Sequence, residues 1–185
     1  MSTPKLSILI PTLFNRQEFL SKLISQLADN EAELLNKIEI LTSCDNGKKS
    51  IGQKRNELLR GATGDYVVFI DDDDDVTSSF IDLIFEGIKK DVDAIGIAMM
   101  YCPDNGPTKK VECSMLNTVW EEKDGVYLRP IQHVCPIKRS IALQVKYPEV
   151  SFGEDHHYSL EVNKLIKTEH LISKPIYFYN FRSQK

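Results

Sequence analysis

Residues 66–75 read Tyr66-Val67-Val68-Phe69-Ile70, followed by five consecutive aspartates, Asp71 to Asp75. The apolar run has no polar alternation, so it predicts a strand that is buried on both faces of a parallel sheet. Ligands of open α/β sheets bind outside the carboxyl ends of the strands, and the acidic run begins there. This stretch therefore predicts the fold class and the edge of the sheet where a ligand binds.

Strand and helix patterns alternate on both sides of this stretch. The predicted strands span residues 6–10, 38–42 and 94–100, and the predicted helices span residues 16–28 and 51–60, with a third helix that Thr77 or Ser78 caps. Right-handed crossovers between such elements build a Rossmann-like, mostly parallel central sheet flanked by helices. The fold class is therefore α/β.

The second half of the chain is less regular. Residues 102–106 and 121–125 are rich in turn signals, residues 128–136 have no helical period, and one hairpin strand is expected at 110–116. A helix is expected from Gly153 through Ile166, and a last strand at 175–181. These patterns predict a smaller mixed or antiparallel region. With no low-complexity linker and no internal repeat, residues 1–185 are expected to form one domain.

Composition indicates an ordinary globular protein, with 42% hydrophobic and 27% charged residues. Lys and Arg number 23 and Asp and Glu 27, and outside the Asp71–Asp75 run the two signs nearly balance, which argues against nucleic acid as a partner. The four cysteines lack metal-site spacing, so reduced thiols are expected. The apolar start of five residues is too short for a signal peptide or a membrane span. We therefore expect a cytoplasmic protein.

The acidic run is either a solvated loop or a cation site. In an extended backbone, Asp71, Asp73 and Asp75 would face one side, and Asp72 and Asp74 the other, so one cation could take only some of them. Mg²⁺ or Mn²⁺ bound by one or two carboxylates completes its shell with water and substrate phosphates. An EF-hand is excluded because its glycine and distal glutamate are absent.

Two other segments carry candidate chemistry. Residues 47–54 resemble a phosphate loop, but Gln53 stands where its lysine belongs, and no dinucleotide motif occurs. Lys54 and Arg55, near a helix start, could offset a diphosphate or lie on a solvated helix face. These residues alone do not decide between the two.

Residues 153–157 read Gly-Glu-Asp-His-His and open the expected helix. Asp155 either stabilises the start of that helix or serves as a general base. His156 or His157 could bind a metal, but adjacent side chains diverge on a helix, so at most one is expected to reach the site.

Four segments then occur together in the order and spacing of a known family: residues 6–15 (LSILIPTLFN), Asp45, residues 53–73 (QKRNELLRGATGDYVVFIDDD) and residues 153–155 (GED). The chain resembles a family 2 glycosyltransferase of the GT-A fold. The resemblance implies inverting transfer of a sugar from a nucleotide-diphosphate sugar, usually UDP-linked, to an acceptor hydroxyl, with Mn²⁺ or Mg²⁺. It also implies a nucleotide-sugar half, about residues 1–76, and an acceptor half, about 77–185.

The resemblance also implies the contacts of the donor. Thr12 and Phe14 match the segment that lies against the nucleoside, and Asp45 matches the acid that hydrogen-bonds the base. Cys44 precedes Asp45 where many members have a second acid, which leaves the choice of base open. Arg182 matches a basic residue over the diphosphate, where Arg55 is the other candidate.

The acidic run falls where the family has its Asp-x-Asp motif. The resemblance assigns the metal to Asp73, with Asp71 and Asp75 as alternatives, and it assigns ribose or sugar contacts to Asp71 and Asp72. His157 stays a further candidate ligand, from its place beside Asp155 and not from the resemblance. Asp155 matches the catalytic base. Each motif is weak alone, and the combination carries the resemblance.

The acceptor and the alternatives remain open. Trp120, Tyr127 and His133 could form a wall for stacking sugars, although core packing is equally compatible with Trp120. One alternative is a nucleotidyltransferase that makes a sugar nucleotide, but residues 11–16 lack its glycine-rich loop. The other is an inactive nucleotide- or metal-binding module of the same fold, against which the presence of Asp155 argues. The oligomeric state cannot be predicted.

Overall fold

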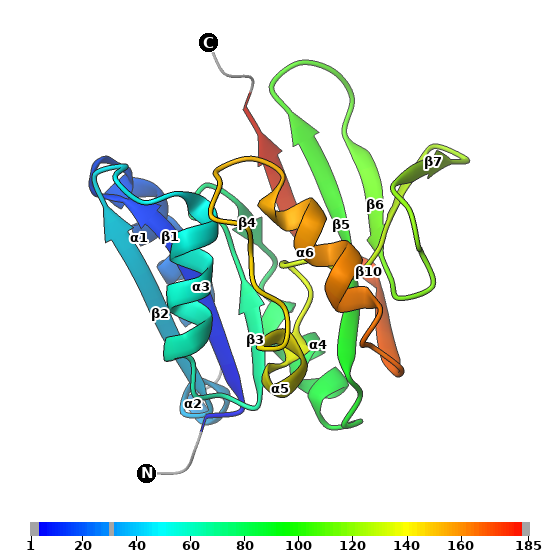
Figure 1. Ribbon diagram of the computed structural model, residues 1–185, viewed down its shortest axis with the longest axis horizontal. Helices are drawn as coiled ribbons and strands as arrows, with labels where there is room; N and C mark the ends of the chain where they lie inside the picture. The colour runs from blue at the N-terminus through cyan, green and yellow to red at the C-terminus, as the bar shows by residue number, and fades with distance from the viewer. Residues whose placement is uncertain (1–3, 30–31, 183–185) are drawn as a thin grey trace.

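The computed structural model describes residues 4–29 and 32–182, which form a ten-stranded sheet with helices on both faces (Figure 1). The strands are β1 (Leu6–Leu13), β2 (Ile38–Asp45), β3 (Tyr66–Phe69), β4 (Asp75–Val76), β5 (Ala94–Pro103), β6 (Lys109–Cys113), β7 (Glu121–Lys123), β8 (Val126–Arg129), β9 (Ile137–Lys138) and β10 (Glu169–Phe181). The helices are the 3-10 turn η1 (Phe14–Arg16), α1 (Gln17–Ala28), α2 (Ala32–Leu35), α3 (Ile51–Gly61), α4 (Phe80–Ile88), α5 (Arg139–Ala142) and α6 (Glu154–Asn163).

The sheet has a parallel half and a mixed half. Its strand order is β2-β1-β3-β9-β5-β6-β8-β7, and β1 is parallel to both β2 and β3. β5 and β6 are antiparallel, as are β7 and β8, whereas β10 returns beside β5 in parallel and pairs with β4. This arrangement confirms the predicted α/β fold with a smaller mixed region.

Helices cover the central strands. In Figure 1, α3, α5 and α6 lie on the near side of the sheet and α1 on its far side, with α4 packed on β5 and β10. The residues of β3 are all buried, which confirms the prediction from their unbroken apolar character. Because the buried strands anchor the backbone, the loops at their carboxyl ends start from fixed points.

Some element bounds differ from the predicted ones. β1 continues past Pro11, because its pairing with β3 ends at Leu9 and the missing amide hydrogen of Pro11 is not needed on that side. α6 ends at Asn163 rather than at Ile166. Two turn hydrogen bonds, from the amides of Lys164 and Leu165, close its end. The N-cap of α4 is Ser79, without a side-chain cap bond, rather than Thr77 or Ser78. The hydroxyl of Thr77 instead lies 3.1 Å from that of Ser79.

Two findings bear on the setting of the protein. All four cysteines are free thiols. Within residues 4–29 and 32–182, none of the helices combines the length and the apolar character that crossing a membrane requires.

Glu39 on β2 joins three segments of the parallel half. Its carboxylate accepts hydrogen bonds from the Ser7 hydroxyl, at 2.6 Å, and from the backbone amides of Thr63 and Gly64. Burial acts to raise the pKa of Glu39, but these hydrogen bonds outweigh it and hold the pKa below its usual value. A lowered folded-state pKa means that the ionised group stabilises the fold above about pH 4, and that this contribution is lost as the pH falls.

We therefore expect Glu39→Gln to lower the free energy of unfolding at pH 7 by about 1–3 kcal/mol, because the amide would set a donor against backbone N–H groups. The difference from wild type should shrink at pH 3. Urea unfolding at both values measures it. Glu33→Gln is the control, because it removes an exposed carboxylate whose ion pair with Lys37 lies at the surface. It should leave the free energy of unfolding unchanged.

Candidate active site

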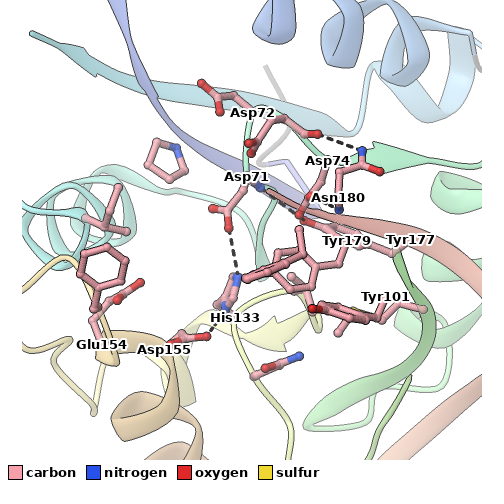
Figure 2. Close-up of a pocket in the computed structure, with 18 of the residues that line it drawn as sticks. Asp71, Asp72, Asp74, Tyr101, His133, Glu154, Asp155, Tyr177, Tyr179 and Asn180 are labelled. Atoms are coloured by element: carbon pink, nitrogen blue, oxygen red, sulfur yellow. Dashed lines mark hydrogen bonds and ion pairs between the residues drawn. The ribbon is translucent and has the colours of Figure 1, made fainter. Parts of the chain in front are cut away.

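A cavity of about 640 Å³ opens at the carboxyl ends of β1 and β3 and extends across β5 and β10 to the start of α6 (Figure 2). Its walls come from both halves of the chain. The lining residues used below are Arg16, Arg55, Asp71, Asp72, Asp73, Asp74, Tyr101, Trp120, Arg129, His133, Glu154, Asp155, Tyr177, Tyr179, Asn180, Phe181 and Arg182. The predicted edge of the sheet therefore holds a cavity of ligand size.

The acidic run is a turn rather than an extended strand. The amide of Asp74 donates to the carbonyl of Asp71 at 3.1 Å, and Asp72 and Asp73 lie in the turn between them. The predicted alternation of side chains is therefore wrong, because it assumed an extended backbone. The turn instead brings the side chains of Asp72 and Asp73 to one cation.

That cation is Arg16, at the end of η1. One guanidinium nitrogen, Nη2, lies 2.7 Å from Asp72 Oδ1 and 2.6 Å from Asp73 Oδ2. The hydroxyl of Thr12 donates to the other oxygen of Asp72 at 2.6 Å. Burial raises the pKa of Asp72, in spite of Thr12 and Arg16. The end of β1 thus holds this pair of carboxylates in place.

The last two aspartates of the run have structural partners. Asp74 is buried and accepts hydrogen bonds from the hydroxyl of Tyr177 and from the amide of Asn180, and burial raises its pKa to about 8. Asp75 binds Lys22 and accepts from the side chain of Asn180 at 3.0 Å. Asp75, an alternative metal ligand in the prediction, therefore faces α1 and β10.

Lys54 and Arg55, the candidate diphosphate cations, are both buried in ion pairs. Lys54 Nζ lies 2.5 Å from Asp45 Oδ1 and donates to the carbonyl of Thr12 at 2.6 Å. Asp45 also accepts from the amide of Lys49, and chiefly its bond with Lys54 holds its pKa well below the usual range. The predicted base-binding acid therefore already serves to join β1, β2 and α3.

Arg55 connects the two acidic segments that the sequence singled out. Its guanidinium donates to Asp71 at 2.9 Å and, more weakly, to Glu154 at 3.4 Å. Gly52 allows α3 to lie close to the segment that precedes α6, because a Cβ at this position would lie 1.7 Å from the carbonyl oxygen of Pro148. Burial acts to raise the pKa of Asp71, but the charges of Arg55 and His133 outweigh it and hold the pKa well below its usual range.

His133 lies between Asp71 and Asp155 (Figure 2). Its Nε2 is 3.7 Å from Asp71 Oδ2 and its Nδ1 is 3.9 Å from Asp155 Oδ2. Asp155 stands in the first turn of α6, where helices favour carboxylates, and its other oxygen accepts from the amide of His156. One oxygen of Asp155 therefore faces the cavity.

The remaining predicted residues are placed as follows. Thr12, Phe14 and Asp45 do not line the cavity: Thr12 reaches it only through its hydrogen bond to Asp72, and Phe14 is 64% exposed on η1. Arg182 lines the cavity, with its guanidinium over the ring of Phe19. His157 is exposed and does not line the cavity, because two helix positions beyond Asp155 turn it about 200° away. The structure therefore gives no support to His157 as a metal ligand.

The acceptor-side wall contains Trp120 and Arg129. The guanidinium carbon of Arg129 lies 3.7 Å from the centre of the Trp120 ring. The ring of His156 contacts that of Trp120 edge to face, with the ring centres 5.1 Å apart. Tyr101 on β5 contacts the rings of Tyr179 and Phe181, both on the neighbouring strand β10. Trp120 therefore belongs to the cavity wall rather than to the core.

The donor set suits a hard divalent cation. In the part of the chain that the structure describes, no three His, Cys, Asp or Glu side chains are arranged to enclose a metal. Mg²⁺ and Mn²⁺ on a diphosphate need only one or two protein carboxylates, and Asp72 and Asp73 already converge on one positive charge, that of Arg16. Asp73 is the more open of the two, with 22% of its side chain exposed.

Sequence reasoning missed Arg16, Asn180 and Arg129, and assigned Glu154 no role. Arg16 follows the first predicted strand, so its place at the same sheet edge as the acidic run was a usable signal. Asn180 reaches the run from β10, Arg129 reaches the cavity from β8, and nothing local in the sequence marks either position.

The fold, with its cavity where β1 and β3 end, defines a GT-A type domain. The chain belongs to glycosyl transferase family 2, whose model matches residues 44–142. This confirms the resemblance drawn from the four sequence segments. A comparison with curated protein sequences finds no match.

Among solved structures, the chain is similar to TarS of S. aureus. TarS residues 1–349 with UDP-GlcNAc superpose with a TM-score of 0.72 at 16% identity, covering 98% of this chain and 60% of that one. The same segment with UDP gives 0.70 at 17% identity, covering 96% and 60%. Longer TarS gives 0.69 at 17% identity, covering 96% and 37%. At these identities the likeness shows the fold, and this chain spans about 60% of the shorter TarS chain.

Proposed function

We propose that the protein transfers a sugar from a UDP-linked donor to an acceptor hydroxyl with inversion at the anomeric carbon. One observation carries the proposal: a single cavity holds Asp72 and Asp73 on one side and Asp155 on the other, with His133 between Asp71 and Asp155. Family membership supports the reaction type. TarS, bound to UDP or UDP-GlcNAc in the similar structures, supports a UDP-linked donor.

The chain's own groups divide the work. Asp155 takes the proton of the acceptor hydroxyl as its oxygen bonds to the anomeric carbon, and the bond from that carbon to the diphosphate breaks, which releases UDP. Arg16 and Arg182 line the cavity on the donor side and can meet the diphosphate. Thr12 and Asp45 hold the loops against which the nucleoside would lie.

Asp73, with Asp72 beside it, is the proposed site for Mn²⁺ or Mg²⁺. When bound, the ion would offset the charge that develops on the leaving diphosphate. Asp71 is the weaker candidate, because Arg55 and His133 already occupy both of its oxygens.

Calorimetric titration of UDP with and without Mn²⁺ tests the proposal. We expect Mn²⁺ to strengthen UDP binding to the wild type, and Asp73→Ala to lose at least about tenfold of that gain. The fold should survive, because Asn180 binds the backbone carbonyl of Asp73 and not its carboxylate.

Asp82→Ala removes an exposed carboxylate on α4 and is the matched control. Full Mn²⁺-dependent UDP binding by Asp73→Ala would refute the metal site. A thermal-shift screen of nucleotides then separates the alternatives, since ligands that bind the native state raise its stability. Stabilisation by nucleoside triphosphates but not by UDP-sugars would favour the synthesis of a sugar nucleotide.

A further inference from the structure

The acceptor end of the cavity contains an unpaired cation. Arg129, at the end of β8, lines the cavity with its guanidinium against Trp120 and 5.4 Å from the centre of the Tyr127 ring. Across residues 4–29 and 32–182 it has no ion pair and no side-chain hydrogen bond, in contrast to Arg16 and Arg55. Burial lowers the pKa of Arg129, as expected for a cation without an anionic partner.

Arg129 stands away from the acidic run along the sheet. In the sheet, β9, β5 and β6 separate β8 from β3, at whose end the acidic run begins. Asp71 contacts His133, His133 contacts Asp155, and the charge of Asp155 acts in turn on Arg129. Because the acceptor hydroxyl must meet Asp155, a molecule bound beside Arg129 occupies the place of the acceptor and not that of the donor diphosphate.

Aromatic side chains line the same cavity as this cation. Trp120, Tyr101, Tyr179 and Phe181 all line the cavity, and Phe181 is 39% exposed. The indole Nε1 of Trp120 is buried without a hydrogen-bond partner among the described residues. Flat apolar faces beside unused donors suit the mixed apolar and hydroxyl surface of a sugar ring.

We propose that the acceptor is an acidic carbohydrate, whose phosphate or carboxylate group binds Arg129 while its sugar ring stacks on the aromatic wall at Trp120. That this ligand is the acceptor rests on the proposed function, but its binding to the site needs neither donor nor metal. The unpaired guanidinium favours a ligand with a negative charge. The aromatic wall favours a ligand that also has a sugar ring over a free anion.

Trp120 is the only tryptophan of the chain, so its fluorescence reports directly on this site. We expect glucose 6-phosphate or glucuronate to change it saturably, with glucose at least about tenfold weaker, because a charge-assisted hydrogen bond to Arg129 is lost. The two acids separate a phosphate site from a carboxylate site. Equal binding of glucose and both acids, or no saturable change with either acid, would overturn the proposal, as would inorganic phosphate binding as tightly as glucose 6-phosphate.

Variants assign the effect to the side chain. Arg129→Gln should abolish the preference for the acidic sugar, whereas Arg129→Lys should retain part of it and guards against misfolding of the first variant. Lys109→Gln, which removes a cation 4.6 Å from the centre of the Tyr127 ring but paired with Glu122, is the control and should keep the preference. A preference that persists in Arg129→Gln contradicts the assignment. UDP titration of the same proteins keeps the tests apart: wild type that binds the acid but not UDP refutes the donor proposal alone.

Discussion

Asp155→Asn should lower turnover by about 10²- to 10⁴-fold, the usual contribution of a general base, and leave UDP affinity unchanged. The asparagine keeps the size of the side chain and can still accept from the amide of His156, which donates to Asp155 Oδ1 at 2.8 Å. It cannot take a proton from the acceptor. The loss is measured as the rate of UDP release in the presence of a panel of acceptors. The donor for this assay is the UDP-sugar that the thermal-shift screen identifies.

The variant isolates proton transfer because Asp155 lies apart from the donor carboxylates. His133 stands between Asp155 and Asp71 (Figure 2), whereas Asp72 and Asp73 form their ion pairs with Arg16 on η1. Glu161→Gln changes a carboxylate on the same helix, ion-paired with Lys164 outside the cavity, and should retain full turnover. Turnover of Asp155→Asn at the wild-type rate would show that Asp155 is not the base. Glu154 could not take over this role without giving up its ion pair with Arg55.

Local sequence was sufficient to predict which edge of the sheet holds the cavity. The apolar stretch of β3 has one stable environment, the interior of a parallel sheet, so the position of the aspartates that follow it could be inferred. The start of α6 could be predicted as well, because a glycine is followed by carboxylates that suit a first turn. In the structure Gly153 adopts a positive φ of 79° and the carboxylates lie in that turn. Both features depend on neighbours a few residues away.

The directions of the aspartate side chains could not be predicted in the same way. Asp74 turns toward Tyr177 and Asn180, which are more than a hundred residues later in the chain, and Asp72 turns toward Arg16. These partners depend on how β10 and η1 pack, which no local pattern of the acidic run encodes. The same holds for Arg129, whose unpaired state is a property of the assembled sheet.

Arg55→Leu should lower the free energy of unfolding by about 3–5 kcal/mol, the usual cost of removing one partner from a buried ion pair. Arg55 is 2% exposed, and its guanidinium lies against the rings of Phe69 and Tyr147. Leucine fills much of the same space, so the loss reports mainly on the carboxylates of Asp71 and Glu154, which would be left without their cation. Urea unfolding measures it.

A double variant separates charge from packing. If uncompensated charge causes the loss, Arg55→Leu/Glu154→Leu should be more stable than Arg55→Leu alone, because the carboxylate that remains most deeply buried has also been removed. If lost packing causes it, the second substitution should not restore stability. Lys49→Leu removes an exposed cation just before the same helix and should leave unfolding nearly unchanged. Since Arg55 ties Asp71 at the end of β3 to Glu154 at the start of α6, a loss of charge compensation would loosen the donor and acceptor halves of the cavity together.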